Sequence, residues 1–177
     1  VRNASNNITT VKGMVSKPAL QESKDRQTQE KSKTALVYDN IYLEHKTTPG
    51  HPESPQRLVA ITERLKASGL YSKLLKISPK PVPSQWLTMV HSPEYIQRVK
   101  QSCENNAGYL DSMDVPISPK SYEAALMAAG GVLYAIDAVV EKKAANAFCA
   151  VRPPGHHSLR DKAMGFCIFN NVAVGAK

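Results

Sequence analysis

Apolar residues recur along the chain in two patterns, one typical of buried strands and one typical of amphipathic helices. A short β-prone run from Thr34 to Tyr38 predicts a buried first strand. A near-continuous apolar run over 146–151 suits a strand buried on both faces. Between these runs the apolar positions repeat at helical spacing. The order strand, helices, strand predicts an α/β fold.

Three Ser-Pro pairs mark the predicted helix starts: Ser54-Pro55, Ser92-Pro93 and Ser118-Pro119. Serine is a favoured N-cap residue, and proline is tolerated at the first helical position because its missing N–H is not needed there. After the third pair, one helix face carries the larger apolar residues, and we expect this face to be buried. Its members are Tyr122, Leu126, Ala129, Leu133, Ile136 and Val140.

The first 33 residues differ in composition from the rest of the chain. They contain no aromatic side chain and are rich in Asn, Ser, Thr, Gln and Lys. Such a segment cannot bury enough apolar surface to offset chain entropy, so we expect a disordered basic tail over 1–33 and a single domain over 34–177. A transit peptide is the alternative for the tail, because no acidic residue precedes Glu22.

The net charge of +8 is divided between the tail and the domain. Seven basic and three acidic residues lie in the tail, so half of the charge belongs to it and no nucleic-acid partner is expected. The longest apolar stretches are expected to be far short of the ~20 residues of a membrane span. Three scattered cysteines do not form a disulfide framework, so a reducing compartment is expected: the cytoplasm, or the nucleus in a eukaryote.

Candidate chemistry lies directly after the second predicted strand, in the segment from Arg152 to His157. Open α/β sheets place ligand sites at the carboxyl ends of their strands. Two adjacent imidazoles, His156 and His157, can hold or transfer a proton near neutral pH. From the residues alone, the pair suits either acid–base or metal chemistry, or a surface role. The loop Met164–Asn171 could form a hydrophobic slot beside it or pack into the core.

Four regions of the chain, in this order, resemble the zinc-dependent histone deacetylase family, in particular its class II and bacterial members, which include acetoin-utilisation and acetylpolyamine deacetylase relatives. They are 50–58 (GHPESPQRL), 90–95 (VHSPEY), 114–119 (DVPISP), and 152–157 (RPPGHH) together with 165–170 (GFCIFN). The chain departs from the family pattern at Ser54, where bacterial members often have Arg, and at Val115, where Thr is usual. The resemblance covers residues 34–177.

The resemblance implies the N-terminal part of an arginase-like, three-layer α/β/α fold with a mostly parallel sheet. It also implies hydrolysis of an acetyl or other acyl amide on a protein lysine or a polyamine. His156 and His157 match the tandem histidines that deprotonate the zinc-bound water and protonate the leaving amine. Asp114 matches a rim aspartate that binds substrate amides, Phe166 matches an aromatic tunnel wall, and Gly165 would allow close approach of the substrate.

Other residues receive a smaller role from the sequence. Arg57 resembles an arginine that lines an internal channel under the family's site. Asp111 is the alternative to Asp114 for the rim position. His51 and His91 are expected to hold loops at helix starts, and His45, which belongs to no motif, is expected at the surface.

The implied cofactor is zinc, yet the family's metal ligands and its transition-state tyrosine follow later in the family sequence than anything matched here. We therefore predict no metal ligand within the 177 residues. The chain is expected to be a fragment that carries the acid/base half of a deacetylase site, that is inactive alone, and whose sheet of two or three strands exposes an unpaired edge. The alternatives are a truncated, non-catalytic binding module and a metal-independent hydrolase, for which no nucleophile is evident.

Overall fold

The computed structural model describes residues 33–177, so the tail predicted over 1–33 lies, apart from Lys33, outside the described residues. In chain order the elements are β1 (Thr34–Val37), η1 (Asn40–Glu44), α2 (Pro55–Ala67), η2 (Tyr71–Lys73), β2 (Leu75–Ile77), α3 (Ser84–Thr88), α4 (Pro93–Glu104), β3 (Tyr109–Leu110), β4 (Ser112–Pro116), α5 (Ser121–Val140), β5 (Asn146–Cys149) and α6 (Asn171–Ala176).

The main sheet has three parallel strands in the order β2-β1-β5. Ala35 in the central strand is in register with Leu75 on one side and Ala147 on the other. Since all three strands run the same way, their carboxyl ends lie at the same end of the sheet, and the loops that follow β1 and β5 begin there. Strands β3 and β4 form a separate antiparallel pair.

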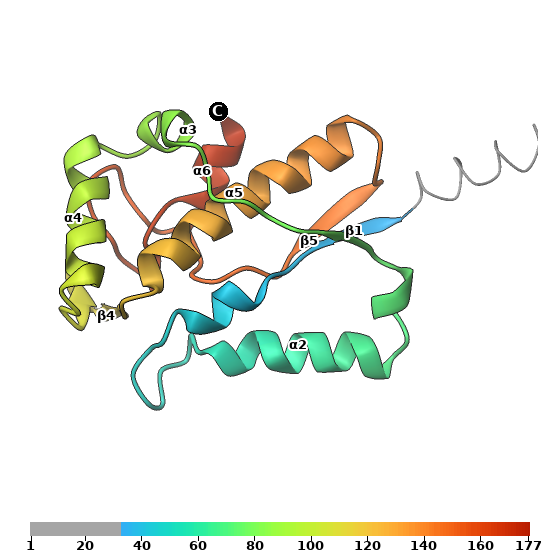
Figure 1. The fold of residues 1–177 in the computed structure, drawn as a ribbon, viewed down its shortest axis with the longest axis horizontal. Helices are drawn as coiled ribbons and strands as arrows, with labels where there is room; N and C mark the ends of the chain where they lie inside the picture. The colour runs from blue at the N-terminus through green and yellow to red at the C-terminus, as the bar shows by residue number, and fades with distance from the viewer. Residues whose placement is uncertain (1–32) are drawn as a thin grey trace, which may run out of the picture.

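Helices lie on both sides of this sheet: α5 on one side and α2 on the other (Figure 1). The predicted first strand is confirmed, because Ala35, Leu36 and Val37 are all buried. Two apolar clusters fill the layers, one between α5, α4 and the 163–174 segment and the other between β1, η1 and α2. The predicted α/β class with helices on both sides of a parallel sheet is therefore confirmed.

The predicted buried face of α5 is confirmed only in part: Ala129 is buried, and Tyr122, Leu126 and Leu133 pack against the core. Ile136 and Val140 of the predicted stripe are exposed, and the buried face consists mainly of alanine and glycine. A Cβ atom added at Gly130 would lie 1.9 Å from the Lys80 carbonyl oxygen, and one at Gly131 would lie 2.8 Å from a Val37 methyl group. Small residues are buried here because the helix backbone approaches its neighbours too closely for larger side chains.

The Ser-Pro predictions are confirmed to different degrees. At the start of α4 the Ser92 hydroxyl accepts a hydrogen bond from the Tyr95 amide at 3.2 Å. Ser54 occupies the N-cap position of α2 but makes no such bond. The third prediction is wrong in its boundary, because α5 begins at Ser121 and the Ser118 amide donates to the Ser121 hydroxyl instead.

Strand β5 is not buried on both faces, as the sequence predicted. Asn146 and Phe148, which alternate onto one face, are exposed, Phe148 by 44%. The reason is that α5 is the described helix that packs on β5 and it covers one face only. Within residues 33–177 the outer edge of β5 has no strand partner, which agrees with the predicted unpaired edge.

Helix α5 is also long and apolar enough to cross a membrane, by length and composition only, with a mean hydropathy of 1.6 over its most apolar window. The expectation that no apolar stretch reaches this length was therefore wrong. In the structure the helix packs against β1, β5 and α6, as a core helix does. A core helix passes the same test of length and hydropathy, so the finding is weak evidence for a membrane span.

At Gly130, close packing and helix propensity predict opposite changes in the free energy of unfolding when glycine is replaced by alanine. Propensity alone would make Gly130→Ala stabilising by about 1 kcal/mol. We expect it instead to destabilise the chain by roughly 1–3 kcal/mol, because the clash is with backbone. Urea unfolding measures the difference. Gly175→Ala is the control: its Cβ would meet only the ends of the Ile136 and Val132 side chains, so a milder effect is expected.

Candidate active site

A cavity of about 530 Å³ lies at the carboxyl-end side of the sheet. Three loops surround it: the segment before α2, the segment that follows β5, and the turn at residues 165–166. The lining residues are Pro52, Glu53, Arg57, Pro154, His156, His157, Gly165 and Phe166. The structure thus brings together four of the five predicted site residues.

The two histidines lie side by side with their rings exposed to this cavity. Their ring centroids are 4.1 Å apart and the planes are tilted by 51°. The His157 amide donates to the Cys167 sulfur at 3.5 Å, and the Cys167 thiol donates to the Gly165 carbonyl at 3.2 Å. These hydrogen bonds therefore join the histidine loop to the turn at residues 165–166, which forms another wall of the cavity.

The turn at Gly165 and Phe166 places both residues in the left-handed region, with φ values of 57° and 67°. A Cβ at position 165 would lie 2.6 Å from Cδ2 of the His157 ring, so only glycine lets the ring pack there. Phe166 bears the cost of this conformation, about 1–2 kcal/mol for a residue other than glycine. Its ring consequently stands edge-on to His51, with centroids 4.7 Å apart.

Asp114, the predicted rim residue, does not line the cavity itself but contacts its wall. One carboxylate oxygen accepts the Gly165 amide hydrogen at 2.8 Å, and the other accepts from the Ser112 hydroxyl. These bonds, chiefly the one from Ser112, lower the pKa of Asp114 although the side chain is exposed. The carboxylate is therefore held in its charged form beside the turn.

Asp111, the alternative rim residue, is occupied elsewhere. Its carboxylate pairs with Arg98 and accepts the Ala163 amide hydrogen at 2.7 Å. Its backbone is left-handed, with φ of 61°. Asp111 thus braces the 161–163 loop through both of its carboxylate oxygens.

Beneath the cavity lies a buried ion pair whose role was not recognised in the sequence. Arg152 is 0% exposed and Glu53 3% exposed. The guanidinium donates hydrogen bonds from Nε and Nη2 to the two carboxylate oxygens, at 2.5 and 2.8 Å. Its Nη1 donates to the carbonyls of Tyr42 and His45 at 2.7 and 3.0 Å. Both residues belong to matched motifs, but neither motif reveals that they meet.

His45 is buried, at 1% exposed, which corrects the prediction that it lies at the surface. It follows η1 directly, and its ring fills the space between η1 and the start of α5. Nδ1 lies 2.7 Å from the Ser121 hydroxyl and Nε2 lies 3.7 Å from the Glu53 carboxylate. Burial, followed by the nearby Arg152 charge, lowers the pKa of His45 to about 3.

His91 holds loops together, as predicted. It is fully buried, its Nε2 accepts the Asn170 amide hydrogen at 2.8 Å, and its Nδ1 donates to the Arg160 carbonyl at 3.2 Å. Burial lowers the pKa of this ring, in agreement with a neutral form that both donates and accepts. The bonds join the two loops that flank His156, His157 and Phe166.

His51 and Arg57 lie on the wall opposite the histidines. His51 Nδ1 lies 2.9 Å from the Glu53 carbonyl oxygen and 3.1 Å from the Glu53 amide nitrogen, and it donates to the first or accepts from the second according to its tautomer. Its predicted loop-holding role is thus confirmed, and its ring also contacts Phe166. Arg57 is half exposed, with Nη1 3.3 Å from the Glu53 carboxylate. It lines the cavity, although its predicted place in an internal channel stays a prediction.

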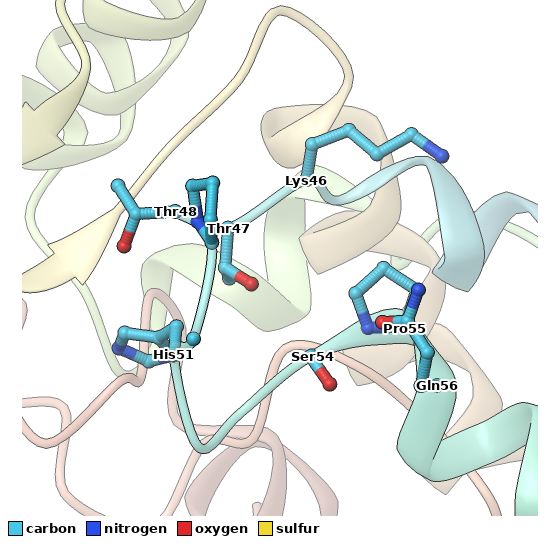
Figure 2. Close-up of a pocket in the computed structure, with 9 residues that line it drawn as sticks. Lys46, Thr47, Thr48, His51, Ser54, Pro55 and Gln56 are labelled. Atoms are coloured by element: carbon cyan, nitrogen blue, oxygen red, sulfur yellow. The ribbon is translucent and has the colours of Figure 1, made fainter.

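A second cavity, of about 470 Å³, lies within the loop that joins η1 to α2. Figure 2 shows the loop doubling back, so that Lys46 and Thr47 lie opposite Ser54 and Gln56. His51 lines this cavity, and its ring contacts Phe166, which lines the first one. The residues that enclose it are exposed or half-exposed, in contrast to the buried ion pair below the first cavity.

The histone deacetylase domain matches residues 51–177, which contain every residue of the cavity. The chain belongs to the histone deacetylase family. It is 38% identical over 159 residues to the histone deacetylase-like amidohydrolase of Pseudomonas aeruginosa, covering 80% of this chain and 42% of that protein. It is 36% identical over 154 residues to the human polyamine deacetylase HDAC10, covering 81% and 23%.

Among solved structures, the HD domain of HDA15 matches with a TM-score of 0.77 and 34% identity, covering 82% of this chain and 42% of that one. The chain therefore spans less than half the length of these relatives. Within residues 33–177, no group of three or more His, Cys, Asp and Glu side chains is arranged to hold a metal ion. The described residues thus do not fit zinc by themselves.

The burial of His45 predicts that the folded state of this chain is less stable in acid. Because the pKa is about 3 when folded and ordinarily 6.5, the unfolded state binds more protons between these values. Stability should fall as pH falls through this window, by on the order of 2 kcal/mol at pH 5. Urea unfolding at a series of pH values checks this. His45→Gln should flatten the dependence, and equal slopes for both proteins would contradict the assignment.

The absence of a ligand cluster among the described residues predicts the response to zinc. Calorimetric titration of the 177-residue chain at pH 7.5 should show no stoichiometric site with a submicromolar Kd. Even if both tandem imidazoles bound the ion, they would supply only two of the three protein ligands that a catalytic zinc needs. A tight one-to-one site would show that other residues of the chain complete the set.

Proposed function

We propose that this chain supplies the proton-transfer half of a zinc-dependent deacetylase that hydrolyses an acetyl or other acyl amide on a lysine or a polyamine. The observation that carries the proposal is the pair His156 and His157 in a cavity walled by Phe166 and Gly165. Family membership supports the same reaction class. The names of two relatives, an amidohydrolase and a polyamine deacetylase, support the substrate classes.

Hydrolysis of an amide needs a base that takes a proton from water and an acid that protonates the departing nitrogen. Two adjacent imidazoles can perform these steps in one site, one accepting the proton while the other donates. In such enzymes zinc supplies Lewis-acid activation of the water. The described residues of this chain hold no zinc site, so the steps assigned to the chain are proton transfers alone.

The walls suit a flat acylated amine on an aliphatic stem. Phe166 presents an apolar ring, and Gly165 lets the His157 ring pack directly against the turn. At the rim, each Asp114 oxygen accepts one hydrogen bond within the protein. A carboxylate has about four acceptor positions, so roughly two remain for N–H groups of a substrate.

A non-catalytic binding role is the second candidate, because no metal-holding cluster occurs among residues 33–177. The same cavity would then recognise an acylated amine without hydrolysing it. Binding of an acetyl-lysine peptide without release of acetate would favour this role.

The test uses the whole product of the reading frame that contains this sequence, loaded with zinc. Acetyl-lysine peptides and acetylated polyamines are assayed for acetate release. We expect His156→Ala and His157→Ala each to lower kcat at least 100-fold with little change in KM, because general acid–base catalysis contributes about 10²–10⁴-fold.

Leu159→Ala is the matched control, since this exposed side chain lies two residues beyond His157 and outside the cavity. It should retain the wild-type kcat. If the histidine variants also retain it, the proposed proton transfers are wrong. If the zinc-loaded wild-type protein binds substrates and releases no acetate, the binding role replaces the enzymatic one.

A further inference from the structure

We propose that the buried pair of Arg152 and Glu53 positions the tandem histidines, by fixing the wall that carries His156 and His157 against the wall formed by residues 51–57. The inference rests on the proposed function for its chemical meaning. Its structural content, that the pair sets the geometry of the cavity, is independent of any turnover.

The Arg152 guanidinium is held by four hydrogen bonds. Nε and Nη2 bind both oxygens of Glu53, and Nη1 binds the carbonyls of Tyr42 and His45. The guanidinium is planar and presents its donors in a rigid fork, so four hydrogen bonds fix its position and its orientation. Arg152 therefore ties the end of β5 to the segment that follows β1.

The link from Arg152 to His156 is stiff. Pro153 and Pro154 have fixed φ values, and Gly155 is enclosed. A Cβ at Gly155 would lie 2.4 Å from the Asn171 amide nitrogen and 2.5 Å from the Phe169 carbonyl oxygen. Because the intervening residues are rigid, a displacement of Arg152 would also displace His156.

The other partner, Glu53, lines the cavity, and its backbone fixes the His51 ring, which stands edge-on to Phe166. The pair thus joins the wall that contains His51 to the wall that contains His157. Since removing two charges from water is costly, a buried pair of this kind contributes little net stability. Its main effect is therefore on the relative position of the two cavity walls.

The test is the double variant Glu53→Leu/Arg152→Met, which replaces the pair by apolar residues of similar size. Such replacements are often neutral or stabilising. We expect the thermal midpoint to be unchanged or raised. We also expect weaker NMR cross-relaxation between the His51 and Phe166 rings and between the His157 ring and Gly165, by at least threefold. Both contacts involve the turn at residues 165–166, which meets the wall that contains His51 on one side and the wall that contains His157 on the other.

Glu141→Leu/Lys143→Met is the matched control, because it removes an exposed ion pair between α5 and β5, at the amino ends of the parallel strands and away from the cavity. Its cross-relaxation should equal that of the wild type. A stable Glu53→Leu/Arg152→Met variant with unchanged cross-relaxation would overturn the proposal. If that variant does not fold, Arg152→Lys decides: it keeps the charge and loses the fork, and unchanged cross-relaxation there would likewise overturn it.

Kinetics give a second readout in the whole gene product. The double variant should lower kcat at least tenfold while KM changes less than threefold, since the substrate walls persist and the proton-transfer groups are displaced. If the wild-type product shows no hydrolysis, the proposed function fails. The cross-relaxation measurement still decides whether the pair positions the histidines.

Discussion

The cavity depends on one buried interaction, the forked contact of Arg152 with Glu53. The walls of the cavity are all connected to it: Pro154 and the histidines follow Arg152 along the backbone, His51 is bound by the Glu53 backbone, and Phe166 contacts the His51 ring. Removal of a single partner would leave an uncompensated buried charge, at a cost of roughly 3–5 kcal/mol. The two residues consequently function as a unit.

The parallel sheet makes this contact possible. Strands β1 and β5 are neighbours and point the same way, so the segments that follow them emerge together, one bringing Glu53 and the other Arg152. Helix α5 adds the remaining constraint, because its first residue, Ser121, contacts the His45 ring, whose carbonyl accepts from Arg152. The small residues on the buried face of α5 bring the helix close enough to the sheet for this arrangement.

The sequence predicts the elements whose signal is local. The strand at Thr34, the cap at Ser92 and the site segment after β5 follow from periodicity, capping chemistry and the topology of parallel sheets. It does not predict β2 or the β3-β4 pair, since runs of two to five residues carry little periodicity. It also misplaces His45, because nothing in the neighbouring residues records a contact with Ser121, 76 positions away. The burial of Arg152 is hidden for the same reason.

Stability and site geometry have different physical sources in this member of the histone deacetylase family. The close packing of α5 on the sheet and on the Lys80–Val82 segment buries apolar surface, which is the dominant favourable term in folding. The Arg152–Glu53 pair pays a desolvation penalty that roughly cancels its attraction. Substitutions that weaken the α5 packing should therefore lower stability and leave the cavity intact in the molecules that remain folded, whereas substitutions at the ion pair can displace the histidines in a chain that melts normally. A measurement of stability alone would detect the first class and miss the second.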